Sequence, residues 1–403
     1  MQIDYFLERE LQHLHYTGST FAKEVLIKLQ RDIKEKASMH FEQALRLSLE
    51  TLQEETEAFL RTKSLKGIST SLSIGPIYIN LVGGESVHGQ RIDTETLFDV
   101  ASITKLPTIL LALHLQERDI LHFEDTVQSR CSFFENLEDY TIEDLLYMRG
   151  EIRTHKRLEQ CKSLQEAEDV LRKLYIHDPD RDRFVYTDMG LIALTKIIEA
   201  ELKRKVPISL GYAGIMRFFI LEPFHLYHTT FFPKGNIAGN GREDFLVNDP
   251  KARTLGGSTG SAGLFTNSKD LFILAQELFK KDALISQENL DLLSTPIRDH
   301  NKGIGGLYQK YPDFSRTYVP PEYSSKTFAS EGTTGSVAIF DRINQLHNTI
   351  LVDSIDPETG KKPDSFKADY NAYQQKITNL TMELSILQKY HRESERKEYV
   401  LKM

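Results

Sequence analysis

The residues with the clearest potential for chemistry are a serine and a lysine three positions apart, Ser102 and Lys105. A serine hydroxyl is a poor nucleophile until a neighbouring base takes its proton, and a partly buried lysine with a lowered pKa can act as that base. If the serine opens a helix, this spacing puts the lysine one turn away on the same face. The same spacing recurs between Ser394 and Lys397, but that pair lies in a run of charges, which we interpret as a solvated helix face.

Spacing alone also fits a purely structural role. In that alternative, Ser102 only caps the helix and Lys105 lies on the surface. A second serine motif, G-x-S-x-G around Ser258, follows a polar segment and lacks the buried strand that such a nucleophile turn requires. We interpret that segment as a glycine-rich loop.

Ser102 falls at a change of pattern. A strand-like apolar run ends at Ala101, and a long amphipathic helix is expected directly after it. Helical patterns then dominate to about residue 300. Strand signals occur before this segment in STSLSIGPIYINLVGG and after it in SVAIFD and NTILVDSI. Strands at both ends with helices between them predict one sheet that carries a helical insertion.

The predicted organisation has three parts. Residues 1–66 form a helical extension whose apolar positions either cover the sheet, which we favour, or mediate assembly. Residues 67–101 and 301–403 form the sheet region, with a closing helix that starts near Lys367. Residues 102–300 form the mostly helical region. The active site is expected between the helical region and the sheet.

Composition and charge exclude several classes of protein. Lys plus Arg total 50 and Asp plus Glu total 58, which gives a net charge of −8, so no nucleic-acid partner is expected. Cys131 and Cys161 are too few for a disulfide framework and lack zinc-site spacing, and we expect free thiols. The sequence shows no signal peptide and no membrane span, which predicts a cytoplasmic protein.

The segment FDVASITK, which contains Ser102, closely resembles the nucleophile segment of the penicillin-recognising serine hydrolases. This family includes class C β-lactamases, D-alanyl-D-alanine carboxypeptidases and esterase-like members. Other segments resemble it in the family's order: TIEDLLYMRG, RFVYTDMGLIALTKIIE, ILEPFHLYHTTF, VNDPKARTLGGSTGSAGLFTNSKDLFILAQ and FASEGTTGSVAIFD. The resemblance covers residues from about 68 to 370. It implies a β-lactamase/transpeptidase-like α/β (α+β) fold, in which terminal helices flank a mixed, mainly antiparallel sheet and an all-helical region is inserted.

The resemblance also implies roles for individual residues. Ser102 would be the acylated nucleophile, Lys105 its proton acceptor, and Tyr186 the phenol that passes a proton to the leaving group. Taken alone, Tyr186 would more simply be a core aromatic residue with its hydroxyl in water. Asp188 stands where the family has asparagine. It would hydrogen-bond Lys105 and raise the pKa of that lysine, which leaves less of it in the neutral form that can accept a proton.

The third family motif, normally Lys-Thr-Gly or His-Thr-Gly, departs most from the pattern. Ser330 stands where the family has its cation and Glu331 where it has threonine, whereas Gly332 matches. The backbone N–H of Thr333 would complete the oxyanion hole with that of Ser102. Serine supplies no charge for a substrate carboxylate, and Glu331 disfavours acidic substrates unless it points away from the groove. We therefore expect poor β-lactamase activity.

Two functions fit these residues. The first is a serine hydrolase that forms an acyl-enzyme on Ser102, with a peptidoglycan-type D-amino-acid amide or a small ester as substrate. The second is a catalytically weakened descendant that uses the groove to bind a peptide or a cell-wall fragment. Neither function requires a metal or an organic cofactor, because lysine and tyrosine supply the acid–base chemistry. No particular oligomeric state is predicted.

Overall fold

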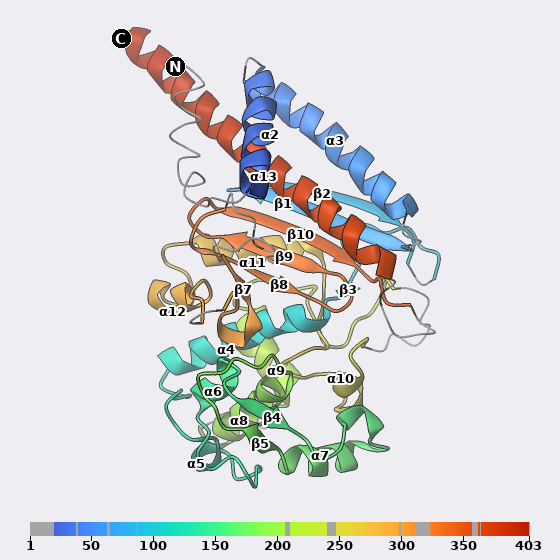
Figure 1. The fold of residues 1–403 in the computed structure, drawn as a ribbon, viewed down its shortest axis with the longest axis vertical. Coiled ribbons are helices and arrows are strands. Elements are labelled where there is room, and N and C mark those ends of the chain that lie inside the picture. The colour runs from blue at the N-terminus through green and yellow to red at the C-terminus, as the bar shows by residue number, and fades with distance from the viewer. Residues whose placement is uncertain are drawn as a thin grey trace.

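The structure is a computed structural model, and a six-stranded sheet crosses its middle (Figure 1). It describes residues 20–37, 39–62, 65–86, 88–205, 210–239, 247–297, 300–310, 319, 323–356, 362 and 364–402. For 20–26, 62, 364–365, 367–368 and 395–402 only the backbone is described.

Both ends of the chain contribute strands to the sheet, as the sequence predicts. The strands are β1 (Gly67–Ile74), β2 (Ile77–Gly84), β7 (Tyr308–Gln309), β8 (Thr327–Glu331), β9 (Val337–Asp341) and β10 (Leu346–Val352). Their order is β2-β1-β10-β9-β8-β7, and each neighbouring pair is antiparallel. The pairing of β1 with β10, from Ile68↔Val352 to Ile74↔Leu346, joins the two ends. The expected α+β fold is confirmed, with a sheet that is antiparallel throughout.

Alternate side chains of β9 face two different cores. Val337 and Ile339 pack with the terminal helices, whereas Ala338 and Phe340 pack with the helical region. Because successive side chains of a strand point to opposite faces, a strand covered on both sides becomes a continuous apolar run. The sheet is therefore the middle layer of three (Figure 1).

Helices from the two ends of the chain cover one face of the sheet. They are α2 (Thr20–Lys36), α3 (Phe41–Thr62) and α13 (Asp364–Lys402). Both α3 and α13 contact β1, and the rings of Phe59 and Tyr373 stack between these helices with centroids 4.5 Å apart. The apolar positions of α3 thus cover the sheet, while residues 1–19 lie outside the described residues. The closing helix begins slightly before the expected Lys367.

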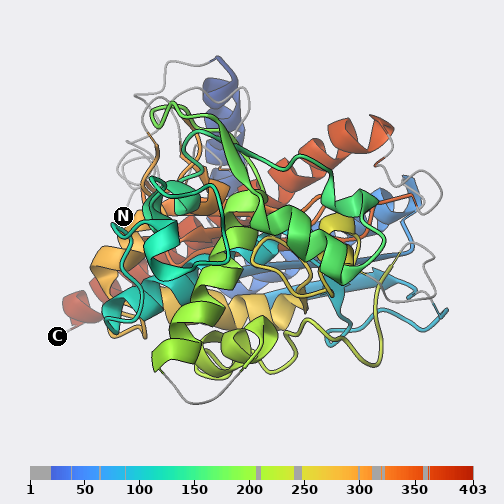
Figure 2. The ribbon, with the colours of Figure 1, turned by 90° about the horizontal axis from the view of Figure 1, so that it is seen from below.

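The segment between the two groups of strands is mostly helical, and its helices lie in front of the sheet when the molecule is seen from below (Figure 2). They are α4 (Lys105–Glu117), α5 (Val127–Arg130), α6 (Ile142–Leu146), α7 (Leu164–Arg172), α8 (Met189–Lys205), α9 (Tyr212–Met216), α10 (Pro250–Thr254), α11 (Ser268–Phe279) and α12 (Gln287–Leu292). The segment is not all-helical, because it also holds the strand pair β4 (Glu151–Arg153) with β5 (Tyr175–Asp178) and the strand β6 (Phe265–Thr266). In addition, α11 packs on β1, β2 and β10.

The helix that follows Ser102 differs from its predicted character. Every residue of α4 from Lys105 to Leu115 is buried. A helix that is buried on every side lies inside the protein, so α4 is a central helix and the amphipathic expectation is wrong. It contacts α8 and α9, which surround it in the helical region. In the described part of the chain, no helix is both long and apolar enough to cross a bilayer.

Candidate active site

Ser102 lies in a short 3-10 turn, η2 (Ala101–Thr104), between the strand β3 (Phe98–Asp99) and α4. The predicted position at the start of a helix is therefore correct, although the first turn is 3-10 rather than α. Ala101 adopts a φ of +44°, which is uncommon for a residue other than glycine. Its N–H donates a hydrogen bond of 2.8 Å to the Asp99 carboxylate, and this contact stabilises the turn that carries the serine.

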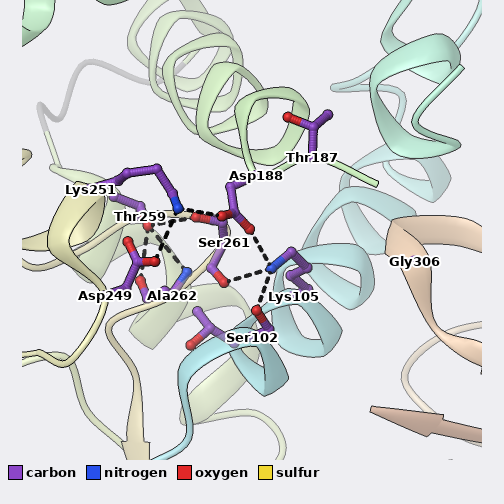
Figure 3. A network of polar contacts seen from close by, with 12 residues as sticks. Ser102, Lys105, Thr187, Asp188, Asp249, Lys251, Thr259, Ser261, Ala262 and Gly306 are labelled. Carbon is purple, nitrogen blue, oxygen red and sulfur yellow. Dashed lines mark hydrogen bonds and ion pairs between the residues drawn. The ribbon is translucent and has the colours of Figure 1, made fainter. Parts of the chain in front are cut away.

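Lys105 is the first residue of α4, and its side chain is only 2% exposed. Its Nζ lies 2.8 Å from Ser102 Oγ and 3.1 Å from the carbonyl oxygen of Ser261 (Figure 3). The alternative that Lys105 is a surface residue is therefore wrong. Ser261 follows the glycine-rich segment around Ser258, which forms a loop as expected and serves here to orient the lysine.

Asp188 lies between two lysine side chains (Figure 3). Its Oδ1 is 2.8 Å from Lys105 Nζ, and its Oδ2 is 2.8 Å from Lys251 Nζ. Lys251 belongs to α10 and is also 3.3 Å from Asp249. The contact between Asp188 and Lys105 follows the sequence-based expectation, whereas Lys251 was not anticipated.

These contacts set the protonation of the site. Burial favours a neutral Lys105, but the Asp188 carboxylate, assisted by the Tyr186 phenol, outweighs it and holds the pKa of Lys105 above its ordinary value. Burial also opposes the ionisation of Asp188, but Lys105 and Lys251 outweigh that effect and lower the pKa of Asp188 to about 2. At neutral pH the site therefore rests with Asp188 as a carboxylate and Lys105 as an ammonium group.

Replacement of Asp188 with asparagine is expected to increase activity at neutral pH. Removal of the carboxylate lowers the pKa of Lys105, so a larger fraction of the lysine is neutral and able to accept a proton. We expect the limb of the pH profile of kcat/KM that rises with pH to move about one unit lower, with a gain of roughly tenfold at pH 7 on a neutral ester. Asp178→Asn, at an ion pair with Arg183, is the control. An unchanged profile, or a shift to higher pH, would contradict the expectation.

All eight site residues predicted from the sequence line one cavity of about 440 Å³: Ser102, Lys105, Tyr186, Asp188, Ser330, Glu331, Gly332 and Thr333. Tyr186 is 47% exposed, so it is not the core aromatic residue of the structural alternative. The centroid of its ring lies 5.2 Å from Lys105 Nζ. The cavity therefore brings the proposed nucleophile, base and phenol into one space.

The strand β8 and the turn after it form another wall of the cavity. Ser330 is buried in β8. Glu331 lines the cavity, where its carboxylate accepts a hydrogen bond of 3.1 Å from the Tyr308 hydroxyl and lies 3.7 Å from Lys362 Nζ. Glu331 thus does not point away from the groove, but its charge is partly balanced by Lys362.

Three cavity-lining lysines were not identified from the sequence, Lys251, Lys302 and Lys362. They come from α10, from the loop before the 3-10 turn η5 (Ile304–Gly306), and from the segment before α13. No motif marks Lys251 or Lys362. Lys302 precedes the run GIGG, and this glycine-rich run is the one sequence signal that could have drawn attention to its loop.

The model of the family described as Beta-lactamase matches residues 75–370. The chain belongs to the β-lactamase family. The match agrees with the range of the resemblance found in the sequence, and the family is one of β-lactamase-like serine hydrolases. A curated relative from Escherichia coli O157:H7, named putative D-alanyl-D-alanine carboxypeptidase, is 24% identical over 339 residues, which cover 69% of this chain and 74% of the relative.

Solved structures share the fold of this family member. A class C β-lactamase has a TM-score of 0.64 at 14% identity, over 82% of this chain and 95% of that one. EstCE1, described as a hydrolase with promiscuous acyltransferase activity, has a TM-score of 0.63 at 15% identity, over 82% and 98% of the two chains. These likenesses confirm the predicted β-lactamase-like fold.

Proposed function

We propose that this protein is a serine hydrolase that works by acyl transfer through an acyl-enzyme on Ser102. The observation that carries the proposal is the contact of 2.8 Å between Lys105 Nζ and Ser102 Oγ at the wall of the cavity. The three donors of the Lys105 ammonium group reach Asp188, the Ser261 carbonyl and Ser102 Oγ, so these partners fix the lysine against the serine hydroxyl. The contact with the hydroxyl is what nucleophilic catalysis requires.

The proposed reaction has two halves. In the first, Ser102 Oγ attacks the substrate carbonyl carbon, and neutral Lys105 accepts the hydroxyl proton. Tyr186, beside Lys105, gives its phenolic proton to the leaving amine or alcohol as its bond to the carbonyl breaks, and the proton on Lys105 then restores the phenol. In the second half, water attacks the carbonyl carbon of the ester on Ser102 and gives a proton to Lys105. The bond to Ser102 Oγ then breaks, Lys105 returns that proton to Oγ, and the acid and the free serine are released. The backbone N–H groups of Ser102 and Thr333 stabilise the oxyanion in both halves.

We infer that the substrates are peptidoglycan-type D-amino-acid amides or small esters. The names of the similar proteins support both classes, since they include a putative D-alanyl-D-alanine carboxypeptidase and the hydrolase EstCE1. A cavity of about 440 Å³ has the size of a small-molecule or short-peptide site.

The test is to mix the protein rapidly with a p-nitrophenyl ester or an N-acetyl-D-alanyl-D-alanine peptide, quench with acid during turnover, and map the acylated peptide by mass spectrometry. We expect the acyl group on the peptide that contains Ser102. Turnover without this acyl-peptide, under conditions in which deacylation is slow, or the absence of turnover for both substrates, would contradict the proposal.

One observation favours the binding module as the second candidate. Asp188 holds Lys105 in its ammonium form, which cannot accept the proton of Ser102. A groove that keeps this ion pair permanently would bind a peptide or cell-wall fragment without cleaving it. Calorimetric binding of such a fragment that remains intact after prolonged incubation would favour this function over hydrolysis.

A further inference from the structure

The charges that line the cavity do not balance. The cavity is lined by four lysines and three carboxylates: Lys105, Lys251, Lys302, Lys362, Asp188, Asp249 and Glu331. Three of the lysines lie within 4 Å of one of these carboxylates. The fourth is Lys302. Within the described ranges of the chain, no carboxylate lies at ion-pair distance from its Nζ. An anionic group bound there would balance the remaining charge.

Lys302 is held at the cavity wall against two aromatic rings. Its Nζ lies 2.8 Å from the centroid of the Tyr308 ring and 5.5 Å from that of Tyr186. It donates a hydrogen bond of 3.1 Å to the carbonyl oxygen of Gly306. Gly306 has a φ of +75°, and a Cβ there would lie 2.6 Å from the Tyr186 ring, so glycine is needed for the loop to come this close.

The ammonium group of Lys302 can donate three hydrogen bonds. Among the residues that the structure describes, the Gly306 carbonyl is the one hydrogen-bond acceptor that it contacts, and the face of the Tyr308 ring covers a second N–H, so one donor remains for a ligand. Lys302 lines the same cavity as Ser102 and Tyr186. A substrate whose carbonyl group reaches Ser102 therefore has a cation within the cavity for a second, anionic group.

We propose that Lys302 determines substrate specificity by binding a carboxylate of the substrate next to the scissile bond. The proposal rests on the proposed acyl-transfer function and narrows its substrate class to anions, such as peptides with a free C-terminal carboxylate. The residues Ser330 and Glu331 led us to expect that acidic substrates bind poorly. The proposal reverses this expectation, because Lys302 supplies from another loop the positive charge that Ser330 lacks in β8. A charge-assisted hydrogen bond from Lys302 contributes affinity that a serine hydroxyl does not.

The protonation of Lys302 provides a second signature. Burial lowers its pKa to about 7, and Lys105 adds to this effect while Glu331 opposes it. The titratable groups that face it come from four segments: Lys105 of α4, Tyr186 before α8, Tyr308 of β7 and Glu331 of β8. Below pH 7 Lys302 carries its charge. Carboxylate binding is therefore expected at pH 6 and is expected to weaken as the pH rises through 7 to 8.5.

The test measures binding, so that it does not depend on turnover. Calorimetry on the Ser102→Ala chain would compare N-acetyl-D-alanyl-D-alanine with its C-terminal amide. At pH 6 we expect the carboxylate to bind about tenfold more tightly than the amide. Lys302→Met, made in the same chain, is expected to remove this preference and to leave the affinity for the amide unchanged. Lys302→Arg is expected to keep the preference up to pH 8.5, because arginine remains charged. Lys269→Met, at an exposed position of α11, is the matched control.

Two results would overturn the proposal. One is equal affinity for the carboxylate and the amide peptide in the Ser102→Ala chain, in which Lys302 is still present. The other is an equal loss of affinity for both peptides in Lys302→Met. The proposed function can fail independently of this site. If the carboxylate preference depends on Lys302 but no acyl group forms on Ser102 in the unsubstituted protein, the anion site is supported and the hydrolase function is rejected. If esters acylate Ser102 but no carboxylate preference exists, the hydrolase function is supported and the anion site is rejected.

Discussion

Lys105→Met is expected to lower kcat/KM for a neutral ester by about 10³-fold. Lys105 Nζ is the basic group in contact with Ser102 Oγ, and methionine has similar length but cannot accept a proton. The fold is expected to tolerate the change, because Asp188 keeps its contact of 2.8 Å with Lys251 and is not left as an unpaired buried charge. Steady-state kinetics with a p-nitrophenyl ester would measure the loss.

Lys196→Met is the control for this change, since Lys196 pairs with Glu168 at the surface of the helical region, 2.9 Å away, and does not line the cavity. We expect nearly unchanged kinetics in that variant. Thermal unfolding of both variants separates a catalytic loss from a folding defect. Activity within tenfold of the unsubstituted protein in Lys105→Met, with the fold intact, would show that Lys105 is not the base.

Gly332→Ala is expected to lower kcat/KM by about 10²-fold, with a smaller effect on stability. A Cβ at Gly332 would lie 2.5 Å from the carbonyl oxygen of Val100, which itself accepts a hydrogen bond from the Ile103 N–H in the turn that carries Ser102. Because both partners are backbone, the turn between β8 and β9 has to move, and Thr333 moves with it. Loss of one oxyanion-hole donor costs about 10²–10³ in kcat.

Gly211→Ala provides the matched comparison, because a Cβ at Gly211 meets no atom within 4 Å. The predicted split is a fall in kcat for Gly332→Ala with little change in KM, as expected for an interaction made mainly in the transition state. If Gly332→Ala retained full kcat, the Thr333 N–H would not belong to the oxyanion hole.

The parts of the fold that the sequence predicts are those with a strong local pattern. The strands β1 and β2 are separated by Gly75 and Pro76, and β9 and β10 by a short polar turn, so their pairing is a local property of the chain. By contrast, the sequence predicts an amphipathic helix for α4, because Lys105, Thr108 and His114 interrupt its apolar residues. Tertiary partners allow two of these polar side chains to be buried: Lys105 pairs with Asp188, and the Thr108 hydroxyl donates to the Gly260 carbonyl.

The same distinction applies to the site. Ser102 and Lys105 are one turn apart in the chain, so their contact could be predicted from spacing. Lys251 comes from the short helix α10 and Lys302 from a loop, both distant from Ser102 in the chain, and a single lysine in a polar segment has no pattern that distinguishes a cavity from solvent. The charge of the site therefore could not be predicted from the third motif alone, where Ser330 suggested that a cation is absent.

The central claim is that Ser102 is an activated nucleophile. Its most direct test is the intact mass of the protein after incubation with a fluorophosphonate, with Ser102→Ala treated in parallel. The expected result is a single covalent adduct on the unsubstituted protein and none on Ser102→Ala, because the reagent reacts with an activated serine hydroxyl. An unmodified mass in both samples, or an adduct of equal extent in both, would contradict the assignment of Ser102 as the nucleophile.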